Sequence, residues 1–162
     1  MNGSGGRLEA RGGFTLLELL VVITIAAIVI TAGTLAFSDY FQRDSARRAA
    51  QVFAQDLTAA RSYAIRVNEP VVIRFYEGSL WYEVVSPVDS TEIARRRFGT
   101  NGDIELSGLT LDLNGDTLVF DSRGMVDVTP WGASIATATF SAGAITYSVS
   151  FNGMGASRIE QS

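Results

Sequence analysis

Residues 14–37 form an almost uninterrupted apolar run, in which Glu18 is the single charged residue. As an α-helix this run would be roughly 36 Å long, against about 30 Å for the hydrocarbon core of a bilayer. A chain of 162 residues can hardly enclose such a helix on every side, which argues against a buried core helix. The run therefore predicts a transmembrane helix over residues 14–37.

A cleaved secretory signal peptide is the main alternative for this run. Such a peptide has a shorter apolar region that is followed by a small-x-small cleavage site. No Ala-x-Ala triplet occurs between Ala26 and Ser38, and the run is too long for this class. The orientation stays open, because arginines flank both ends of the run.

Three residue types are absent from the sequence, which has no Cys, no His and no Lys, so that all 13 basic residues are arginines. This excludes zinc sites built on Cys or His, cysteine nucleophiles, Ser-His-Asp triads and lysine Schiff bases. Disulfides cannot form either. No catalytic constellation remains, and the sequence predicts a protein that is not an enzyme and has no cofactor, and it assigns no residue to a metal site.

A short motif stands at the N-terminal edge of the apolar run. The letters G-F-T-L-L-E begin at Gly13 and place Phe14 and Glu18 at a fixed spacing, after a leader that carries Arg7 and Arg11. This arrangement resembles the type IV prepilin signature, which is shared by pilins, type II secretion pseudopilins and competence pilins. The resemblance implies cleavage after Gly13 by a prepilin peptidase and N-methylation of Phe14. The missing side chain at Gly13 suits the close approach of a protease.

Glu18 would lie at hydrocarbon depth in the predicted span. An isolated carboxylate there costs about 3 kcal/mol on insertion scales, so a compensating interaction is expected. The side chain could reach toward the nearby interface, or it could pair with a positive charge from another chain. The resemblance implies the second interpretation, in which Glu18 of one subunit faces the amino terminus of Phe14 in its neighbour during assembly. Each charge would then offset the desolvation cost of the other.

Beyond residue 37 the pattern becomes amphipathic, and it predicts that the helix continues over residues 38–66. Pro70 disfavours helix in the residue before it, so the helix is expected to end near residues 67–70. The predicted apolar face consists of Phe41, Ala46, Ala49, Phe53, Leu57, Ala60 and Ala64. The other faces hold Asp44, Arg48, Gln51, Gln55, Asp56 and Arg61.

Residues 67–162 are expected to form a β-rich globular head. Alternation of apolar and polar residues predicts strands over residues 71–76, 80–85, 93–98, 109–113, 117–121, 125–129, 135–141, 145–151 and 156–160. Asn114-Gly115 is a strong turn signal and favours a hairpin between the fourth and fifth of these strands. The predicted fold class is α+β, with the long N-terminal helix packed on antiparallel β-sheets. The resemblance implies the same arrangement, which is the pilin-like fold.

Three further segments narrow the resemblance. Residues 50–66, 120–124 (F-D-S-R-G) and 149–155 (V-S-F-N-G-M-G) are similar to the GspH/FimT branch of the family. This similarity implies a minor pseudopilin of a type II secretion system, with residues 1–13 as the leader. Such a protein crosses the bacterial inner membrane once, and its C-terminal head lies in the periplasm.

The same resemblance implies a set of partners. The subunit would join other pseudopilins or pilins through its N-terminal helix and form a short pseudopilus that drives the export of secreted cargo. The alternative is a FimT-like minor pilin that acts in type IV pilus assembly or in DNA uptake. Neighbouring subunits, the inner membrane and the prepilin peptidase are expected partners under both interpretations.

Arg95, Arg96 and Arg97 form the one basic run of the sequence, and Arg158 follows Gly155 near the C terminus. These four arginines are the candidates for DNA contact under the alternative. In a strand, successive arginines point to opposite faces, with Arg96 expected nearer the core. Loss of the leader removes two of the 13 arginines and one of the 17 acidic residues and leaves a net charge of −5, which argues against DNA. The other interpretation of the run is a charged edge strand that resists aggregation.

Asp112, Asp116 and Asp121 surround the Asn114-Gly115 turn. Calcium requires six to eight oxygens that converge on one point, whereas three acids on alternating strands are more typical of ordinary turns. The sequence leaves open whether the head binds calcium. Two tryptophans are expected to act as core or interface anchors, at Trp81 and Trp131.

The prepilin resemblance makes a prediction about processing. The mature chain is expected to begin at Phe14 and to carry a methyl group on its terminal amine. The measurement is the intact mass of protein extracted from the membranes of a host with an active prepilin peptidase. A chain that still begins at Met1 and lacks the methyl group would contradict the resemblance.

Overall fold

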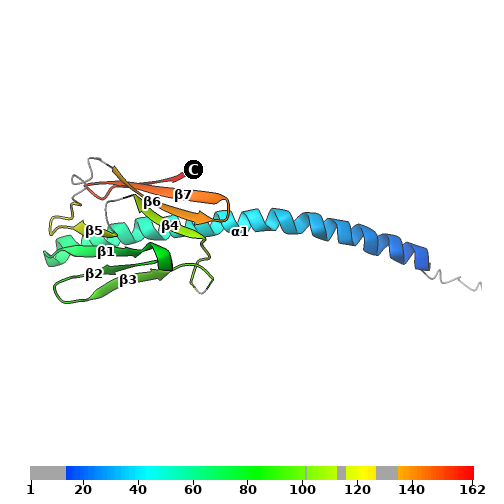
Figure 1. Ribbon diagram of the computed structural model, residues 1–162, viewed down its shortest axis with the longest axis horizontal. Coiled ribbons are helices and arrows are strands. Elements are labelled where there is room, and N and C mark those ends of the chain that lie inside the picture. The colour runs from blue at the N-terminus through cyan, green and yellow to red at the C-terminus, as the bar shows by residue number, and fades with distance from the viewer. Residues whose placement is uncertain (1–13, 101, 113–115, 127–134) are drawn as a thin grey trace, which may run out of the picture. The chain divides into compact units, whose positions relative to one another are not determined.

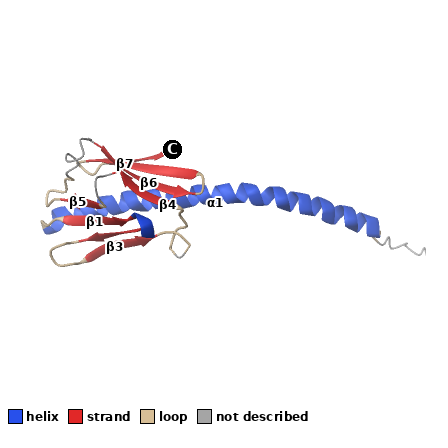
Figure 2. Cartoon of the chain, viewed as in Figure 1, coloured by secondary structure: helices blue, strands red, loops and turns tan. Residues whose placement is uncertain are grey.

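The computed structural model describes residues 14–100, 102–112, 116–126 and 135–162, with the backbone alone for residues 32–36. The chain divides into two compact units, Met1–Phe37 and Ser38–Ser162, and helix α1 (Leu16–Val67) contributes residues to both. In the described ranges, strands and one short 3₁₀ turn follow this helix (Figure 1, and Figure 2 by secondary structure).

The helical part of the first unit begins with a capped turn. Thr15 precedes the first helical residue, and its Oγ1 accepts a hydrogen bond of 3.2 Å from the backbone N–H of Glu18. All described side chains from Phe14 to Thr31 are exposed. Among the described residues no helix combines the length and the apolar character needed to cross a membrane, so the span predicted over residues 14–37 is not confirmed.

The end of α1 at Val67 confirms the expectation drawn from Pro70. Asn68 adopts a left-handed backbone with φ of 57°, and the N–H of Glu69 donates to the carbonyl of Ala64 over 3.2 Å. This closure satisfies a carbonyl of the last helical turn. The chain then enters the first strand.

The predicted apolar face of α1 is confirmed from residue 46 onward and is wrong at two points. Phe41 is 64% exposed, because it precedes Ala46 by five residues and so lies about 140° around the helix from it. Asp56 was assigned to a polar face but is only 5% exposed, since it lies one helical turn after Phe53 on the buried side. The predicted positions that are fully buried are Ala46, Ala49, Phe53, Leu57, Ala60 and Ala64.

Two antiparallel sheets pack along the second half of α1 (Figure 1). The first sheet has the order β3-β2-β1-β5 and the second has the order β4-β6-β7-β8. The strands of the first sheet are β1 (Val71–Tyr76), β2 (Trp81–Val85), β3 (Glu92–Arg97) and β5 (Thr117–Phe120), with the 3₁₀ turn η1 (Glu77–Ser79) between β1 and β2. The strands of the second sheet are β4 (Gly108–Asp112), β6 (Ile135–Ala142), β7 (Ile145–Asn152) and β8 (Ser157–Gln161).

Eight of the predicted strands are confirmed to within one residue at each end. The remaining prediction, a strand over residues 125–129, has a smaller counterpart. Val126 forms a single bridge with Phe120, and residues 127–129 lie outside the described residues. The predicted antiparallel arrangement of the sheets on the helix is confirmed.

The hairpin predicted between residues 109–113 and 117–121 is wrong. β4 pairs with β6 in the second sheet, whereas β5 pairs with β1 in the first. Local alternation and a turn signal cannot distinguish a hairpin from a crossover between sheets, because both need a reversal of the chain. The turn residues Asn114-Gly115 themselves lie outside the described residues.

Phe53 lies at the centre of the core of the second unit. Its ring stands edge-on to the rings of Phe75 and Tyr82 in the first sheet, with centroids 5.4 Å away in both cases. It also contacts Phe140 at 5.5 Å and Phe151 at 6.1 Å in the second sheet. Both sheets therefore share one aromatic contact on α1.

Replacement of this ring tests its role. Phe53→Ala is expected to lower the free energy of unfolding by about 3–5 kcal/mol, because it leaves a cavity between both sheets and the helix. Urea denaturation followed by circular dichroism measures the change. Val52→Ala, at the preceding half-buried position, is the control and should cost about 1 kcal/mol or less. Equal losses for the two variants would contradict a central role for Phe53.

Candidate functional site

The first candidate site is the start of α1. Thr15 caps the helix and Glu18 is the third helical residue, which is the Thr-x-x-Glu spacing of a capping box. Phe14 stands just outside the helix and is 81% exposed. Within the described residues the carboxylate of Glu18 has no ion-pair partner. The cap therefore orders the helix start, where the helix dipole favours the carboxylate of Glu18 but no described residue forms an ion pair with it.

Gly13 lies outside the described residues. Cleavage after Gly13, methylation of Phe14 and the assembly role of Glu18 consequently stay predictions.

The arginine run lies on β3, an edge strand of the first sheet, as one interpretation of the sequence expected. Arg96 points inward, also as expected, and forms a bidentate ion pair with Asp56 of α1. Its Nε lies 2.8 Å from Oδ2 and its Nη2 lies 2.9 Å from Oδ1. The hydroxyl of Tyr82 on β2 donates to the same Oδ2 over 2.8 Å. Three elements are thus joined through one buried carboxylate.

Each member of the trio Asp56, Tyr82 and Arg96 holds a protonation state that suits its hydrogen bonds. Burial, followed by the neighbouring carboxylate of Asp56, raises the pKa of Tyr82 and keeps its phenol neutral. The hydrogen bond to Asp56 raises the pKa of Arg96, which stays charged. The carboxylate of Asp56 accepts two charge-assisted hydrogen bonds from Arg96 and one neutral hydrogen bond from Tyr82, and these three bonds offset the cost of its desolvation. The amino-acid pattern does not predict this trio, although Asp56 follows Phe53 by about one helical turn, which indicates the buried side of α1.

The other arginines of the run point to the outer face of the first sheet. Arg95 pairs with Glu92 on its own strand and with Glu83 on β2, where Nη2 and Oε2 are 3.3 Å apart. Arg97 is exposed and has no ion-pair partner among the described residues. Arg158 lies on β8 of the second sheet and pairs with Glu160 at 2.9 Å. The four candidate arginines thus differ in direction, pairing and sheet.

The acids that were considered for calcium do not share a site. Asp112 ends β4 in the second sheet, and Asp116 precedes β5 in the first. Asp121 closes its own loop by accepting bonds of 2.9 Å from the N–H groups of Met125 and Arg123. These bonds, with that to Met125 as the largest contribution, lower the pKa of Asp121. No group of three possible metal ligands is found among the described residues.

Two glycine-containing segments, F-D-S-R-G and N-G-M-G, come together near the end of α1. The N–H of Val126, just after the first segment, donates to the carbonyl of Gly153 over 2.7 Å. Gly124 has φ of 73°, and a Cβ there would fall 2.7 Å from Cδ1 of Ile65 on α1. Both the backbone conformation and the lack of space require glycine at this point. These motifs therefore serve packing of the head.

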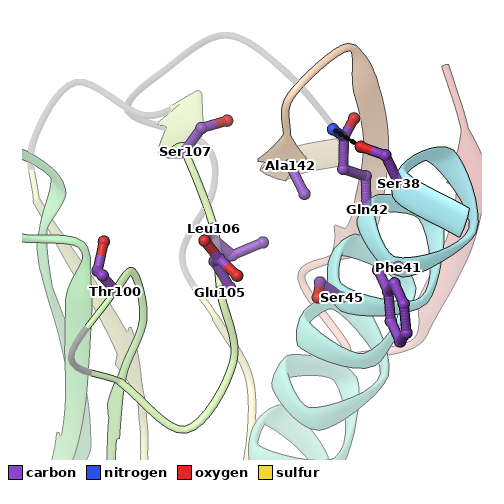
Figure 3. Close-up of a pocket in the computed structure, with 9 residues that line it drawn as sticks. All are labelled: Ser38, Phe41, Gln42, Ser45, Thr100, Glu105, Leu106, Ser107 and Ala142. Atoms are coloured by element: carbon purple, nitrogen blue, oxygen red, sulfur yellow. Dashed lines mark hydrogen bonds between the residues drawn. The ribbon is translucent and has the colours of Figure 1, made fainter. Parts of the chain in front are cut away.

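A groove of about 590 Å³ opens beside the part of α1 that begins at Ser38 (Figure 3). Its helical side contains Gln42, whose Nε2 donates to Oγ of Ser38 over 3.3 Å. Glu105 is the one charged residue among the described residues that line it. The lining is Ser38, Phe41, Gln42, Ser45, Thr100, Glu105, Leu106, Ser107 and Ala142. Among the described residues, this lining contains neither a nucleophile–base pair nor a set of metal ligands.

The raised pKa of Tyr82 predicts a specific response to alkali. A tyrosine in the unfolded chain ionises near pH 10, whereas the folded chain holds Tyr82 neutral to higher pH. The stability due to this group is therefore fully present below about pH 10 and is lost as the pH rises further. Near-ultraviolet absorbance should show that Tyr82 ionises only with unfolding, and Tyr82→Phe should remove that step. Ordinary ionisation of Tyr82 in the folded protein would contradict the buried trio.

Comparison with known proteins places the chain in a family. A family model described as Type II transport protein GspH matches residues 49–159, and one described as the prokaryotic N-terminal methylation motif matches residues 10–34. A search of curated protein sequences found no match. The matched ranges cover most of the head and the motif at the start of α1.

Solved structures share the fold at low sequence identity. The type IV minor pilin FimU of Pseudomonas aeruginosa has a TM-score of 0.57 and 15% identity, over 75% of this chain and 92% of that chain. A second crystal form of FimU gives 0.50 and 15%, over 70% and 91% of the two chains. The minor pseudopilin EpsH of the Vibrio cholerae type 2 secretion system gives 0.49 and 18%, over 72% and 97%.

The likeness to FimU shows the fold, and the family model carries the assignment because it matches more than half of the chain. The family is one of structural pilins and pseudopilins. The protein belongs to the GspH family of minor pilins and pseudopilins, with a type IV pilin-like fold and an N-terminal methylation motif.

Proposed function

We propose that the protein is a minor pseudopilin of a type II secretion system. It is made as a membrane precursor, cleaved after Gly13 by prepilin peptidase, and assembled into a short periplasmic pseudopilus that drives protein export. The observation that carries this proposal is that one helix connects two matched regions. The methylation motif matches residues 10–34, the GspH model matches residues 49–159, and α1 includes part of each. A head fused to such a motif suits a subunit that is anchored and then assembled.

The proposal divides the chain into four parts. Residues 1–13 are the leader, 14–37 the transmembrane helix, 38–66 its amphipathic continuation and 67–162 the periplasmic head. The anchor proposal is supported by the apolar side chains at the start of α1, which are exposed all around the helix. Such a helix must be covered on every side, and inner-membrane lipid before assembly and neighbouring helices after it both meet that need.

In this proposal, Glu18 sets the axial position of each helix relative to its neighbour in the filament. After cleavage, the new amino group of Phe14 carries a positive charge at the same depth in the helix bundle as the carboxylate of a neighbour's Glu18. The exposed carboxylate of Glu18, which has no ion-pair partner among the described residues, supports this pairing. Burying either charge alone would be costly, whereas the pair lowers the cost for both.

A FimT-like minor pilin of a type IV pilus is the second candidate. The fold likeness to the minor pilin FimU favours it, and any DNA contact would use Arg158, Arg95, Arg96 or Arg97. The internal pairing of Arg96, Arg95 and Arg158 supports a structural role for those three instead. A gene deletion separates the candidates, because loss of protein export supports secretion, whereas loss of pili or of DNA uptake supports the pilus.

Glu18→Ala tests the assembly role directly. The variant should still insert, because removal of a charge eases insertion, and it should still be processed, because the peptidase acts at Gly13. Assembly should fall by at least about tenfold, since the amino group of a neighbour loses its counter-charge. Disulfide crosslinking between single cysteines introduced along the helix reports assembly, and the natural chain has no cysteine to interfere.

Glu18→Gln is the matched control, because it keeps the size of the side chain and removes only the charge. It should fail as Glu18→Ala does, whereas Glu18→Asp should retain part of the assembly. Normal crosslinking by Glu18→Gln would overturn the proposed pairing, and unprocessed protein would instead point to a role of Glu18 in cleavage.

A further inference from the structure

The outer face of the first sheet carries an unusual set of side chains for a surface. Strand register places Arg97, Trp81 and Tyr76 in one row across β3, β2 and β1. The rings of Trp81 and Tyr76 are stacked, with centroids 3.8 Å apart and planes inclined by 4°. The guanidinium of Arg95 lies 5.4 Å from the Trp81 ring centre. We call these four residues the Trp81 face.

Most charges around the Trp81 face are already paired. Glu83 on β2 accepts from Arg74 at 3.4 Å and from Arg95 at 3.3 Å, and Arg95 also pairs with Glu92. Arg97 is the exception, since it is exposed and lacks an ion-pair partner among the described residues. The face therefore presents one available positive charge beside a stacked aromatic pair.

A groove of about 500 Å³ lies beside Arg97. The side chains of Trp81 and Arg97 line this groove, and so do Gly78 and Gly99, which have no side chain. A Cβ built at Gly78 would have no atom within 4 Å, so the rim is open there. A partner chain can thus approach the backbone closely while it contacts both side chains.

Protection of the sheet edge does not account for this arrangement by itself. Charged residues on β3 are enough to discourage pairing with another strand. Among the described strands, Phe75, Tyr82 and Phe140 bury their rings almost completely. Tyr76 is instead 38% exposed and Trp81 is half-buried on the outer face. Trp, Tyr and Arg are the residues enriched at the energetic centres of protein interfaces.

We propose that the Trp81 face binds an acidic segment of a partner protein. A carboxylate of that segment pairs with Arg97 in the groove, and an apolar or aromatic side chain packs on Trp81. A protein segment is favoured over a nucleic acid, because the guanidinium of Arg97, which has no ion-pair partner among the described residues, suits a single carboxylate, whereas a phosphate backbone needs several clustered positive charges. The proposal does not depend on which type of filament the subunit joins.

The test uses the full chain in detergent micelles and a labelled random copolymer of glutamate and tyrosine as the probe. Fluorescence anisotropy of the probe should show saturable binding. Arg97→Glu should raise the Kd by at least about tenfold, and Trp81→Leu should do the same by removing the stacking surface. Arg158→Glu makes the same charge change on an exposed strand of the other sheet and should alter the Kd by less than about twofold.

Each other outcome overturns the proposal. Equal weakening by Arg97→Glu and Arg158→Glu would mean attraction by overall charge, and absence of saturable binding would mean that the face is only structural. Tighter binding of an oligodeoxythymidine than of the copolymer, lost in Arg97→Glu, would assign the face to nucleic acid. Circular dichroism checks folding, and the exposed position of Arg97 keeps that variant informative if Trp81→Leu unfolds.

Discussion

The ring of Phe53 is the contact on which the arrangement of the head depends. The two sheets are separate hydrogen-bonded ladders, so backbone pairing alone does not set their relative position. Phe53 touches Phe75 and Tyr82 on one sheet and Phe140 and Phe151 on the other. Small alanines on the same face of α1 let both sheets approach the helix closely. The side chain of Phe53 thus lets one helix pack against both sheets at the same point.

Polar links then fix what apolar packing leaves free. Asp56 joins α1 to β2 and β3, because its carboxylate accepts hydrogen bonds from the hydroxyl of Tyr82 and from Nε and Nη2 of Arg96. A second link runs between the sheets, where Oε1 of Glu77 accepts from the N–H of Leu111 over 2.7 Å. Apolar contacts tolerate sliding, whereas hydrogen bonds of defined geometry do not, so these links specify one register of the packed layers.

The two units of the chain serve different needs. Side chains at the start of α1 are exposed and apolar, and this is the segment proposed to meet lipid or other helices. The head buries its own core and turns an aromatic and basic surface outward at Trp81 and Arg97. Membership of the GspH family fits this division, because an assembled subunit needs one shared segment and one distinctive head.

The sequence by itself determined the elements and the family, because those signals are local. The apolar run and G-F-T-L-L-E motif, the stop at Pro70 and the alternation within each strand act over a few residues, and the strand ends follow them closely. Only the tertiary structure decided that β4 and β5 separate into different sheets, that Asp56 is buried with Arg96, and that Trp81 faces outward beside Arg97. Each of these depends on which distant strand offers the better register and burial, and that competition is settled by packing of the whole head rather than by any short segment.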